Sequence, residues 1–338
     1  MSSRRPMLPS ESAPHRRRWC LLVITVLALV VSACGGGSGA PAAGNSTSTV
    51  TDSGTASNAL PGTGRPPVTI GDKNFTEQFV LGQLYTLALQ AQGYTVQLNE
   101  NIGPTSVTMQ ALRTGALDMY PEYLNTFNGT IAHNGRRYAT ETAAYGAAQR
   151  YAGNHGLTLL TATPFSDTPA LGVTVGYAAG NGLSSVADLT RVQRSMVVGG
   201  PPEFQQLSPG LRDLERNYGF HVYAFKSMGI GDQYTALNDG TIQVADVGTT
   251  DGELNSGDYA VLADPRHTFG YGNAVPVVSR KALAAEGPDF GVTVDRVNAL
   301  LSTAVIRELN AEVDVAGKDP NVVARTFLET HGVIPPGS

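Results

Sequence analysis

The sequence has 338 residues and a formal net charge of −5, from 23 basic and 28 acidic side chains. This acidic balance argues against nucleic-acid binding. Only two cysteines occur, Cys20 and Cys34, and both lie close to the N-terminus. The rest of the chain therefore has no disulfide and no thiol chemistry, and its stability must come from a packed core.

The first 33 residues have the pattern of a lipoprotein signal peptide. Five arginines precede an apolar run over residues 19–31, which is short for a membrane span, and Ser32 and Ala33 follow it. Cys34 then stands where a bacterial lipoprotein carries its lipidated first residue. An uncleaved signal anchor is the alternative. Cleavage before Cys34 would remove five arginines and one glutamate, which changes the net charge to −9.

Residues 34–67 are predicted to be the lipidated cysteine and a flexible tether. Glycine, serine, threonine and proline dominate this stretch, and large apolar side chains are almost absent. A coil of this composition and length reaches roughly 30 Å. No later stretch is long and apolar enough to cross a bilayer, so the remaining 270 or so residues are expected to form an extracytoplasmic globule large enough for two lobes.

The globular part begins with a β-branched run at residues 68–70, which favours a buried strand. An apolar stripe from Val80 to Ala91 then indicates a helix, and Asn74 with Glu77 predicts a capping box at its start. Lys73 is thus expected between the end of a strand and the start of a helix. In open α/β sheets ligands bind there, and both elements favour an anionic group. A solvated loop lysine is the simpler interpretation.

Residues 94–123 and 222–251 follow the same plan of strand, turn, helix, glycine and strand. The sequence Ala-Leu-x-x-Gly-x-Leu at residues 111–117 matches Ala-Leu-x-x-Gly-x-Ile at residues 236–242. Two similar α/β lobes are therefore predicted, although turns of this type also recur by coincidence. Further strands are expected at residues 196–198, 260–262 and 275–278, and helical patterns at residues 294–313 and 320–331.

Motifs for catalysis are absent. The sequence contains no Gly-x-Ser-x-Gly elbow, zinc-binding His-Glu-x-x-His, phosphate-binding loop or dinucleotide motif, and its six histidines lack metal-ligand spacing. Asp118 and Glu122 form one candidate carboxylate pair. Hydrogen bonding to loop amides explains both carboxylates more simply, but a secreted hydrolase that uses one of them as its base remains the second hypothesis.

Tyrosines gather in the loops instead. Tyr120 and Tyr123 follow a predicted strand, and Phe269 and Tyr271 lie in a later loop. Tyrosine faces attract cations by about 0.5 to 2 kcal/mol each. An ordinary half-buried core role is the alternative for any single tyrosine.

Several sequence blocks appear in the order of a known family. Their starting points are Lys73 (KNFTEQ), Gly103 (GPTS), Asp118 (DMYPEY), Pro202 (PEF), Thr250 (TDG), Phe269 (FGY) and Leu309 (LNAEVD). Together they resemble the substrate-binding proteins of the glycine betaine/carnitine/choline (osmoprotectant) ABC transporters. The resemblance runs from about Val68 through nearly all of the chain.

This resemblance implies an α/β chain with the type II periplasmic-binding-protein fold. Two Rossmann-like lobes with mixed sheets would be joined by two crossover strands and would close on a ligand. Residues 68–168 and 273–338 would form the first lobe, and residues 169–272 the second.

The resemblance also implies a site in which tyrosines hold a quaternary ammonium group while lysine, threonine and arginine hold a carboxylate. By motif, Lys73 takes the lysine position, Thr126 the threonine position, and Tyr123 and Tyr271 two box positions. Asp167 and Tyr234 are expected contacts from the second lobe.

Three positions depart from the family pattern. Pro169 and Gly248 stand where tyrosines are expected, and Leu207 stands where the arginine is expected. Two lost aromatic faces would remove about one to four kcal/mol of cation attraction. Asp167 could supply a compensating negative charge. The ligand therefore stays open among a betaine, choline, a neutral osmolyte, a sugar-like compound and an aromatic solute.

The leading hypothesis is thus a lipid-anchored, monomeric solute receptor outside the cytoplasm. It would need no cofactor or metal, and it would deliver its solute to an ABC permease and, through it, serve the ATPase subunit. A sensor lobe that reports the solute to a partner is a third interpretation of the same cleft.

Overall fold

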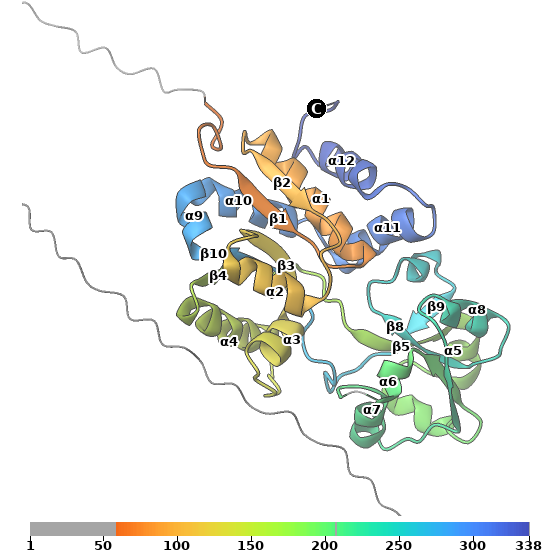
Figure 1. Ribbon diagram of the computed structural model, residues 1–338. Coiled ribbons are helices and arrows are strands. Elements are labelled where there is room, and N and C mark those ends of the chain that lie inside the picture. The colour runs from red at the N-terminus through yellow and green to blue at the C-terminus, as the bar shows by residue number, and fades with distance from the viewer. Residues whose placement is uncertain (1–58, 207, 338) are drawn as a thin grey trace, which may run out of the picture. The chain divides into compact units, whose positions relative to one another are not determined.

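The computed structural model describes residues 59–206 and 208–337. The expected signal peptide, Cys34, most of the tether and Leu207 lie outside these residues. Within them, ten strands form two five-stranded sheets, ordered β2-β1-β3-β10-β4 and β7-β6-β8-β5-β9 (Figure 1). We call the part built on the first sheet lobe 1 and the part built on the second sheet lobe 2.

The sheet of lobe 1 is mixed. Its strands are β1 (Val68–Gly71), β2 (Val96–Asn99), β3 (Met119–Tyr123), β4 (Leu157–Leu159) and β10 (Ala274–Ser279). Strand β1 pairs in parallel with β2 and β3, whereas β10 pairs antiparallel with β3 and β4. The register joins Tyr123 to Ala274, so a strand from the end of the chain completes a sheet begun by the first strand.

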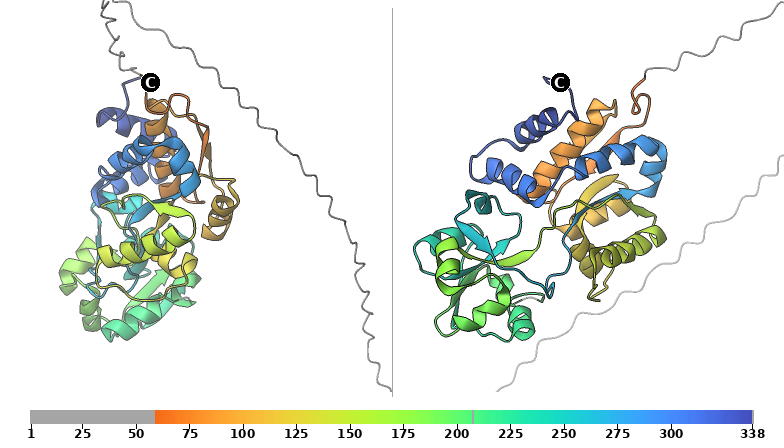
Figure 2. Two further views of the ribbon diagram at one scale, coloured as in Figure 1. Left: turned by 90° about the vertical axis from the view of Figure 1, so that its left-hand side faces the viewer. Right: turned by 180° about the vertical axis from the view of Figure 1, so that it is seen from behind.

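Helices cover both faces of this sheet (Figure 2). One group packs over one face: α1 (Thr76–Ala91), α10 (Pro288–Asn298), α11 (Thr303–Asp314) and α12 (Pro320–Thr330). Near the other face lie α2 (Thr105–Thr114), α3 (Leu124–Thr126), the π-helix η1 (Phe127–Ile131) and α4 (Glu141–Asn154). Helix α9 (Arg280–Glu286) follows β10. Alternate residues of each strand enter the two cores, as Met119 and Tyr120 illustrate.

Lobe 2 repeats this architecture. Its strands are β5 (Pro169–Thr174), β6 (Val197–Gly200), β7 (Ala224–Ser227), β8 (Val244–Gly248) and β9 (Tyr259–Val261). Its helices are α5 (Val175–Asn181), η2 (Val186–Arg191), α6 (Pro202–Gln206), α7 (Leu211–Tyr218), α8 (Asp232–Asn238) and η3 (Gly252–Ser256). Strand β6 pairs in parallel with β7 and β8, and β5 pairs antiparallel with β8 and β9.

The two predicted repeats occupy equivalent places. Residues 94–123 contain β2, α2 and β3, and residues 222–251 contain β7, α8 and β8. In each sheet the two strands of the repeat flank one parallel strand, β1 or β6. The prediction of two similar α/β lobes and the mixed-sheet fold class are confirmed.

Two segments connect the lobes, between β4 and β5 and between β9 and β10. They meet at an antiparallel bridge between Ser166 and Asn273, and the Asp167 N–H donates to the Gly272 carbonyl at 2.9 Å. A side chain at Gly272 would overlap the Asp167 carbonyl, so this crossing requires glycine. The crossing sets the segment just before β5 beside the segment just before β10.

Helix α11 of lobe 1 also contacts η3 of lobe 2. The Arg307 Nε donates to the Thr249 carbonyl at 2.8 Å, and the Asn310 amide donates to the Thr250 carbonyl at 2.9 Å. A Cβ on Gly252 would lie 2.7 Å from the Ala311 backbone nitrogen, so the two backbones approach closely. The two lobes are therefore also in contact here, next to the connection between β4 and β5, because the Thr249 hydroxyl donates to the Ser166 carbonyl at 2.8 Å.

The end of the predicted tether lies against lobe 1. The Gly62 N–H donates to the Gln92 carbonyl at 2.9 Å, and the Arg65 guanidinium donates to the Ala285 carbonyl at 3.1 Å. Gly62 is buried. The flexible part expected up to residue 67 therefore ends before these contacts.

Two local expectations are wrong. The helical pattern over residues 294–313 is broken between α10 and α11, where Ser302 caps the second helix. The capping box of Asn74 and Glu77 does not form, because Phe75 is the N-cap and makes no side-chain cap bond. The side chain of Glu77 is instead buried in lobe 1, where it accepts a hydrogen bond from the Tyr123 hydroxyl at 2.7 Å.

Candidate functional site

A cavity of about 390 Å³ lies between the two lobes. Lobe 1 reaches it through the segments that follow β1 and β3, and lobe 2 through the ends of β6 and β8 and the loop before α8. The carboxyl ends of parallel strands are the usual ligand sites of such sheets. Four of the predicted site residues line this cavity together: Lys73, Tyr123, Thr126 and Asp167.

Lys73 makes a buried ion pair. Its ammonium lies 2.5 Å from Oε1 of Glu122, and only 6% and 0% of the two side chains are exposed. Glu122 also accepts from the Tyr123 N–H at 2.9 Å, the Thr105 hydroxyl at 2.9 Å and the Tyr120 hydroxyl at 3.2 Å. Lys73 therefore reaches the cavity as expected, but its charge is already compensated. A direct contact of Lys73 with an anionic ligand group stays a prediction.

Two aromatic rings line the cavity from lobe 1. Phe75 and Tyr123 stack with ring centroids 6.1 Å apart and an angle of 26° between the planes. The Lys73 ammonium lies 4.7 Å from the Tyr123 centroid and 5.7 Å from the Phe75 centroid. These rings thus form an aromatic wall suited to a cation. Phe75 is missing from the sequence-based site, although it lies in the same motif as Lys73.

Carboxylates stand where one aromatic wall was expected. Gly248 lines the cavity, and a Cβ placed on it would overlap a carboxylate oxygen of Asp251 and lie 3.5 Å from Oδ1 of Asp167. The missing side chain at Gly248 therefore makes room for two acidic groups. Pro169, at the other departure from the family pattern, lines the cavity too.

Burial disfavours the ionised form of these two carboxyl groups. Burial raises the pKa of Asp251 to about 6, against the hydrogen bonds that it accepts from the Tyr234 hydroxyl at 2.6 Å and the Gly248 N–H at 2.9 Å. Burial likewise raises the pKa of Asp167. Each carboxylate would gain from a nearby positive charge.

Asp246 is a third acidic group in the cavity wall. It lies on β8, two residues before Gly248, and burial followed by repulsion from Asp251 raises its pKa to about 8. Its Oδ1 is buried and has no hydrogen-bond partner among the described residues. Sequence reasoning missed Asp246 and Asp251. Asp251 follows Thr250 in a quoted motif, but only the position of β8 could have indicated Asp246.

Glu77 links the aromatic wall to lobe 2. Its carboxylate accepts from the Tyr123 hydroxyl at 2.7 Å and from the Asn310 amide at 3.1 Å, and Asn310 also donates to Thr250 of lobe 2. Burial, followed by repulsion from Asp167, raises the pKa of Glu77 to about 8. This network orients Tyr123 and ties it to the contact between the lobes.

The other two predicted residues do not line this cavity. Tyr234 is buried behind it and acts through Asp251, to which its hydroxyl donates. Tyr271 lines a neighbouring cavity, stacks on His267 and donates to the Ala139 carbonyl at 2.9 Å. Tyr271 is thus not brought together with Tyr123 in one aromatic box.

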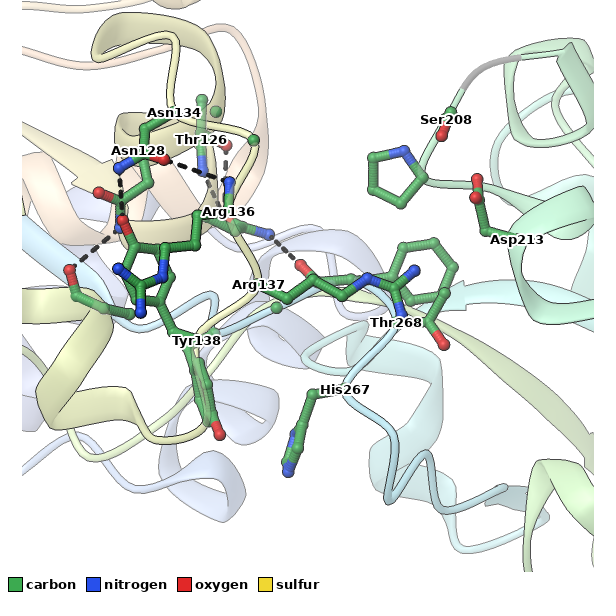
Figure 3. Close-up of a pocket in the computed structure, with 18 of the residues that line it drawn as sticks. Thr126, Asn128, Asn134, Arg136, Arg137, Tyr138, Ser208, Asp213, His267 and Thr268 are labelled. Carbon is green, nitrogen blue, oxygen red and sulfur yellow. Dashed lines mark hydrogen bonds between the residues drawn. The ribbon is translucent and has the colours of Figure 1, made fainter. Parts of the chain in front are cut away.

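The neighbouring cavity has a volume of about 730 Å³ and shares Asn125, Thr126 and Pro169 with the first. Figure 3 shows the labelled residues from Thr126 to Tyr138 on one side of it and Ser208 and Asp213 on the other. Arg136 and Arg137 contribute positive charge here. This cavity therefore differs in chemistry from the acidic cavity beside it.

The two carboxylates of the hydrolase hypothesis are both engaged elsewhere. Asp118 accepts the Thr69 N–H at 2.9 Å, and Glu122 accepts its four donors inside lobe 1. Neither side chain lines either of the two cavities between the lobes. The geometry therefore offers neither of them to a substrate in these cavities.

Among the described residues, no helix is both long and apolar enough to cross a bilayer. The same residues contain no group of three or more histidine, cysteine, aspartate or glutamate side chains arranged to hold a metal ion.

Comparison with known families gives a match over residues 66–330. The matching family is described as the substrate binding domain of ABC-type glycine betaine transport systems. The chain belongs to this family. Among individual proteins, a glycine-betaine-binding protein of Pseudomonas aeruginosa is 33% identical over 280 residues, which cover 79% of this chain and 89% of the relative.

Other members of the ABC-type glycine betaine substrate-binding family are similar at lower identity. The glycine betaine-binding protein YehZ of Escherichia coli is 28% identical over 81% of this chain and 93% of its own. A crystal structure described as a glycine betaine/carnitine/choline ABC transporter superposes with a TM-score of 0.74 at 25% identity, covering 79% of this chain and 99% of that chain. The type II binding-protein fold expected for the family is thereby confirmed.

Proposed function

We propose that this protein captures a small solute with a quaternary ammonium group in the cavity between its lobes and delivers it to the permease of an ABC importer. One observation carries the proposal. Phe75 and Tyr123 form an aromatic wall on one side of the cavity, and Asp167, Asp246 and Asp251 place carboxylates on the other.

An ammonium group between these walls gains from both. Each aromatic face contributes about 0.5 to 2 kcal/mol, and the carboxylates add Coulombic attraction inside a partly desolvated site. Because the aromatic wall belongs to lobe 1 and Asp246 and Asp251 belong to lobe 2, a bound solute favours the arrangement in which both lobes reach it. The permease can then distinguish loaded from empty protein by the relative position of the lobes.

The finer parts of the proposal come from the N-terminal sequence and the family. Cys34 would carry the lipid, and residues 35–59 would tether a monomeric domain outside the cytoplasm near the permease and its ATPase subunit. Labelling cells with a fatty-acid analogue tests this arrangement. The protein should be labelled, the Cys34→Ser variant should not, and equal labelling of both would contradict the anchor.

Calorimetric titration tests the solute class. Glycine betaine, proline betaine, carnitine and choline share the quaternary ammonium group, and at least one of them should bind with one-to-one stoichiometry. No heat for all four would refute the proposal. Ergothioneine belongs in the same panel, because a Helicobacter pylori relative, 24% identical over 79% of this chain, is named for its transport.

A further inference from the structure

We infer that the cavity selects a small organic cation carrying a hydrogen-bond donor, such as choline, over a zwitterion with the same ammonium head, and that Asp246 determines this preference. The inference deepens the proposed function and rests on it. It follows from the sign of the charges around the cavity and from the hydrogen-bonding state of each.

Among the described residues that line the cavity, Lys73 is the one basic side chain, and its ammonium is 2.5 Å from the buried carboxylate of Glu122. These residues therefore offer no unpaired positive charge to a ligand carboxylate. Glu122 belongs to a network of four donors and cannot release Lys73 without leaving its own charge unpaired. A zwitterion would therefore bring its carboxylate into a wall that is acidic and otherwise neutral.

The same cavity has three acidic groups that differ in their hydrogen bonding. Asp251 is satisfied by the Tyr234 hydroxyl and the Gly248 N–H, and Asp167 lies against Gly248 beside it. Asp246 is different, because its buried Oδ1 has no partner in the described residues. A buried acceptor without a donor is costly, so a donor on the ligand is the natural complement.

The position of Asp246 is fixed by close packing. It stands on β8 opposite Leu171 of β5, and a Cβ on Gly200 would come within 2.7 Å of its own Cβ. The backbone and the Cβ of Asp246 are therefore fixed between neighbouring strands. A ligand hydroxyl or N–H group that contacts Asp246 would therefore meet an acceptor on a rigid strand.

Choline and glycine betaine form a matched pair for the test, since they share a trimethylammonium head and differ in a hydroxymethyl against a carboxylate. Calorimetry on the purified protein should give a Kd for choline at least tenfold lower than that for glycine betaine. Asp246→Asn should weaken choline binding at least tenfold. It should also reduce the ratio of the Kd for glycine betaine to the Kd for choline. Asp167→Asn, which removes a neighbouring charge without altering β8, should shift the ratio in the same direction.

Glu286→Gln is the matched control, because Glu286 also has a buried carboxylate oxygen without a partner but lies on α9, outside the cavity. It should leave the ratio unchanged. Equal or tighter binding of glycine betaine by the wild type, or an unchanged ratio in both aspartate variants, would overturn the inference and leave the proposed function intact. Binding of neither solute, nor of proline betaine or carnitine, would overturn both.

Discussion

The ammonium of Lys73 and the carboxylate of Glu122 lie 2.5 Å apart inside lobe 1, and the same ammonium lies 4.7 Å from the centre of the Tyr123 ring. The pair gives Lys73, two residues after the end of β1, a structural role. Because Glu122 balances the charge of Lys73, the aspartates in the cavity wall are not balanced by this lysine.

Removing Lys73 alone should be strongly destabilising. Lys73→Met leaves Glu122 charged and buried, and breaking a buried pair in this way costs about 3 to 5 kcal/mol of unfolding free energy. The double variant Lys73→Met/Glu122→Gln should recover most of that loss. Urea unfolding measures both. Lys318→Met, which removes an exposed pair with Glu312, should change the unfolding free energy by about 1 kcal/mol or less.

Truncating the ring of Phe75 should weaken solute binding with little effect on folding. The side chain is 39% exposed, and Phe75→Leu keeps its apolar character but removes the aromatic face. A loss of about 0.5 to 2 kcal/mol corresponds to a Kd raised about two- to thirty-fold. Phe75→Tyr should bind within about twofold of the wild type. Equal affinities for Phe75→Leu and the wild type would remove Phe75 from the site.

Glu77 should make the protein less stable as the pH rises. Its pKa is about 8 in the folded protein against 4.5 as the ordinary value, so the folded state holds its proton more tightly. The stabilising contribution of this protonation is complete below pH 4.5 and is lost as the pH rises towards 8. Glu77→Gln should flatten the dependence of the unfolding free energy on pH between these values. Urea unfolding at pH 5, 6.5 and 8 measures this dependence. The same change of unfolding free energy with pH in Glu77→Gln and the wild type would contradict the prediction.

Cation binding should release protons near neutral pH. Burial raises the pKa of Asp251 to about 6 and that of Asp246 to about 8, and Asp246 faces Asp251. Asp251 in turn faces Tyr234, Asp167, Asp314 and Arg307. A bound cation favours the ionised carboxylates, so affinity for choline should increase as the pH rises from 6 to 8.

Titrations in two buffers with different ionisation enthalpies count the released protons. The count at pH 7 should be above zero for the wild type and smaller for Asp246→Asn. Proton uptake on binding would contradict the assigned charges.

The contact between α11 and η3 should tolerate no side chain at Gly252. Gly252→Ala places a Cβ 2.7 Å from the Ala311 nitrogen, and the resulting displacement should cost about 1 to 3 kcal/mol of unfolding free energy. Gly176→Ala on α5 is the matched control, because no heavy atom lies within 4 Å of its added Cβ. It should be neutral or raise stability by up to about 1 kcal/mol. Similar melting temperatures for the two variants would argue against close contact of the two backbones.

Local patterns predicted much of the fold because their causes are local. The stripe from Val80 to Ala91 became α1, and Gly115 ended α2 in the left-handed conformation that favours glycine. The paired strand-helix-strand units became equivalent parts of two sheets. The pattern over residues 294–313 failed because apolar periodicity continues across a break that Ser302 caps.

The site was harder to predict. Asn74 and Glu77 have the spacing of a capping box, but Glu77 gains more from the Tyr123 hydroxyl and the Asn310 amide, which lie far away in the sequence. Tyr271 lies in a loop with the expected motif, yet its hydroxyl is used by the Ala139 carbonyl in the neighbouring cavity. The hydrogen-bond partners of Glu77 and Tyr271 are distant in the sequence, so spacing between neighbouring residues does not predict them.

The sequence by itself determined the two-lobed α/β fold, the family, and the strand-end loops that carry Lys73, Tyr123, Thr126 and Asp167. Only the tertiary structure decided the charge of the cavity. A carboxylate or ammonium acts on a ligand according to what neutralises it, and the neutralising groups here come from other strands. Glu122 compensates Lys73 within lobe 1, whereas Oδ1 of Asp246, on β8 of lobe 2, has no partner in the described part of the chain.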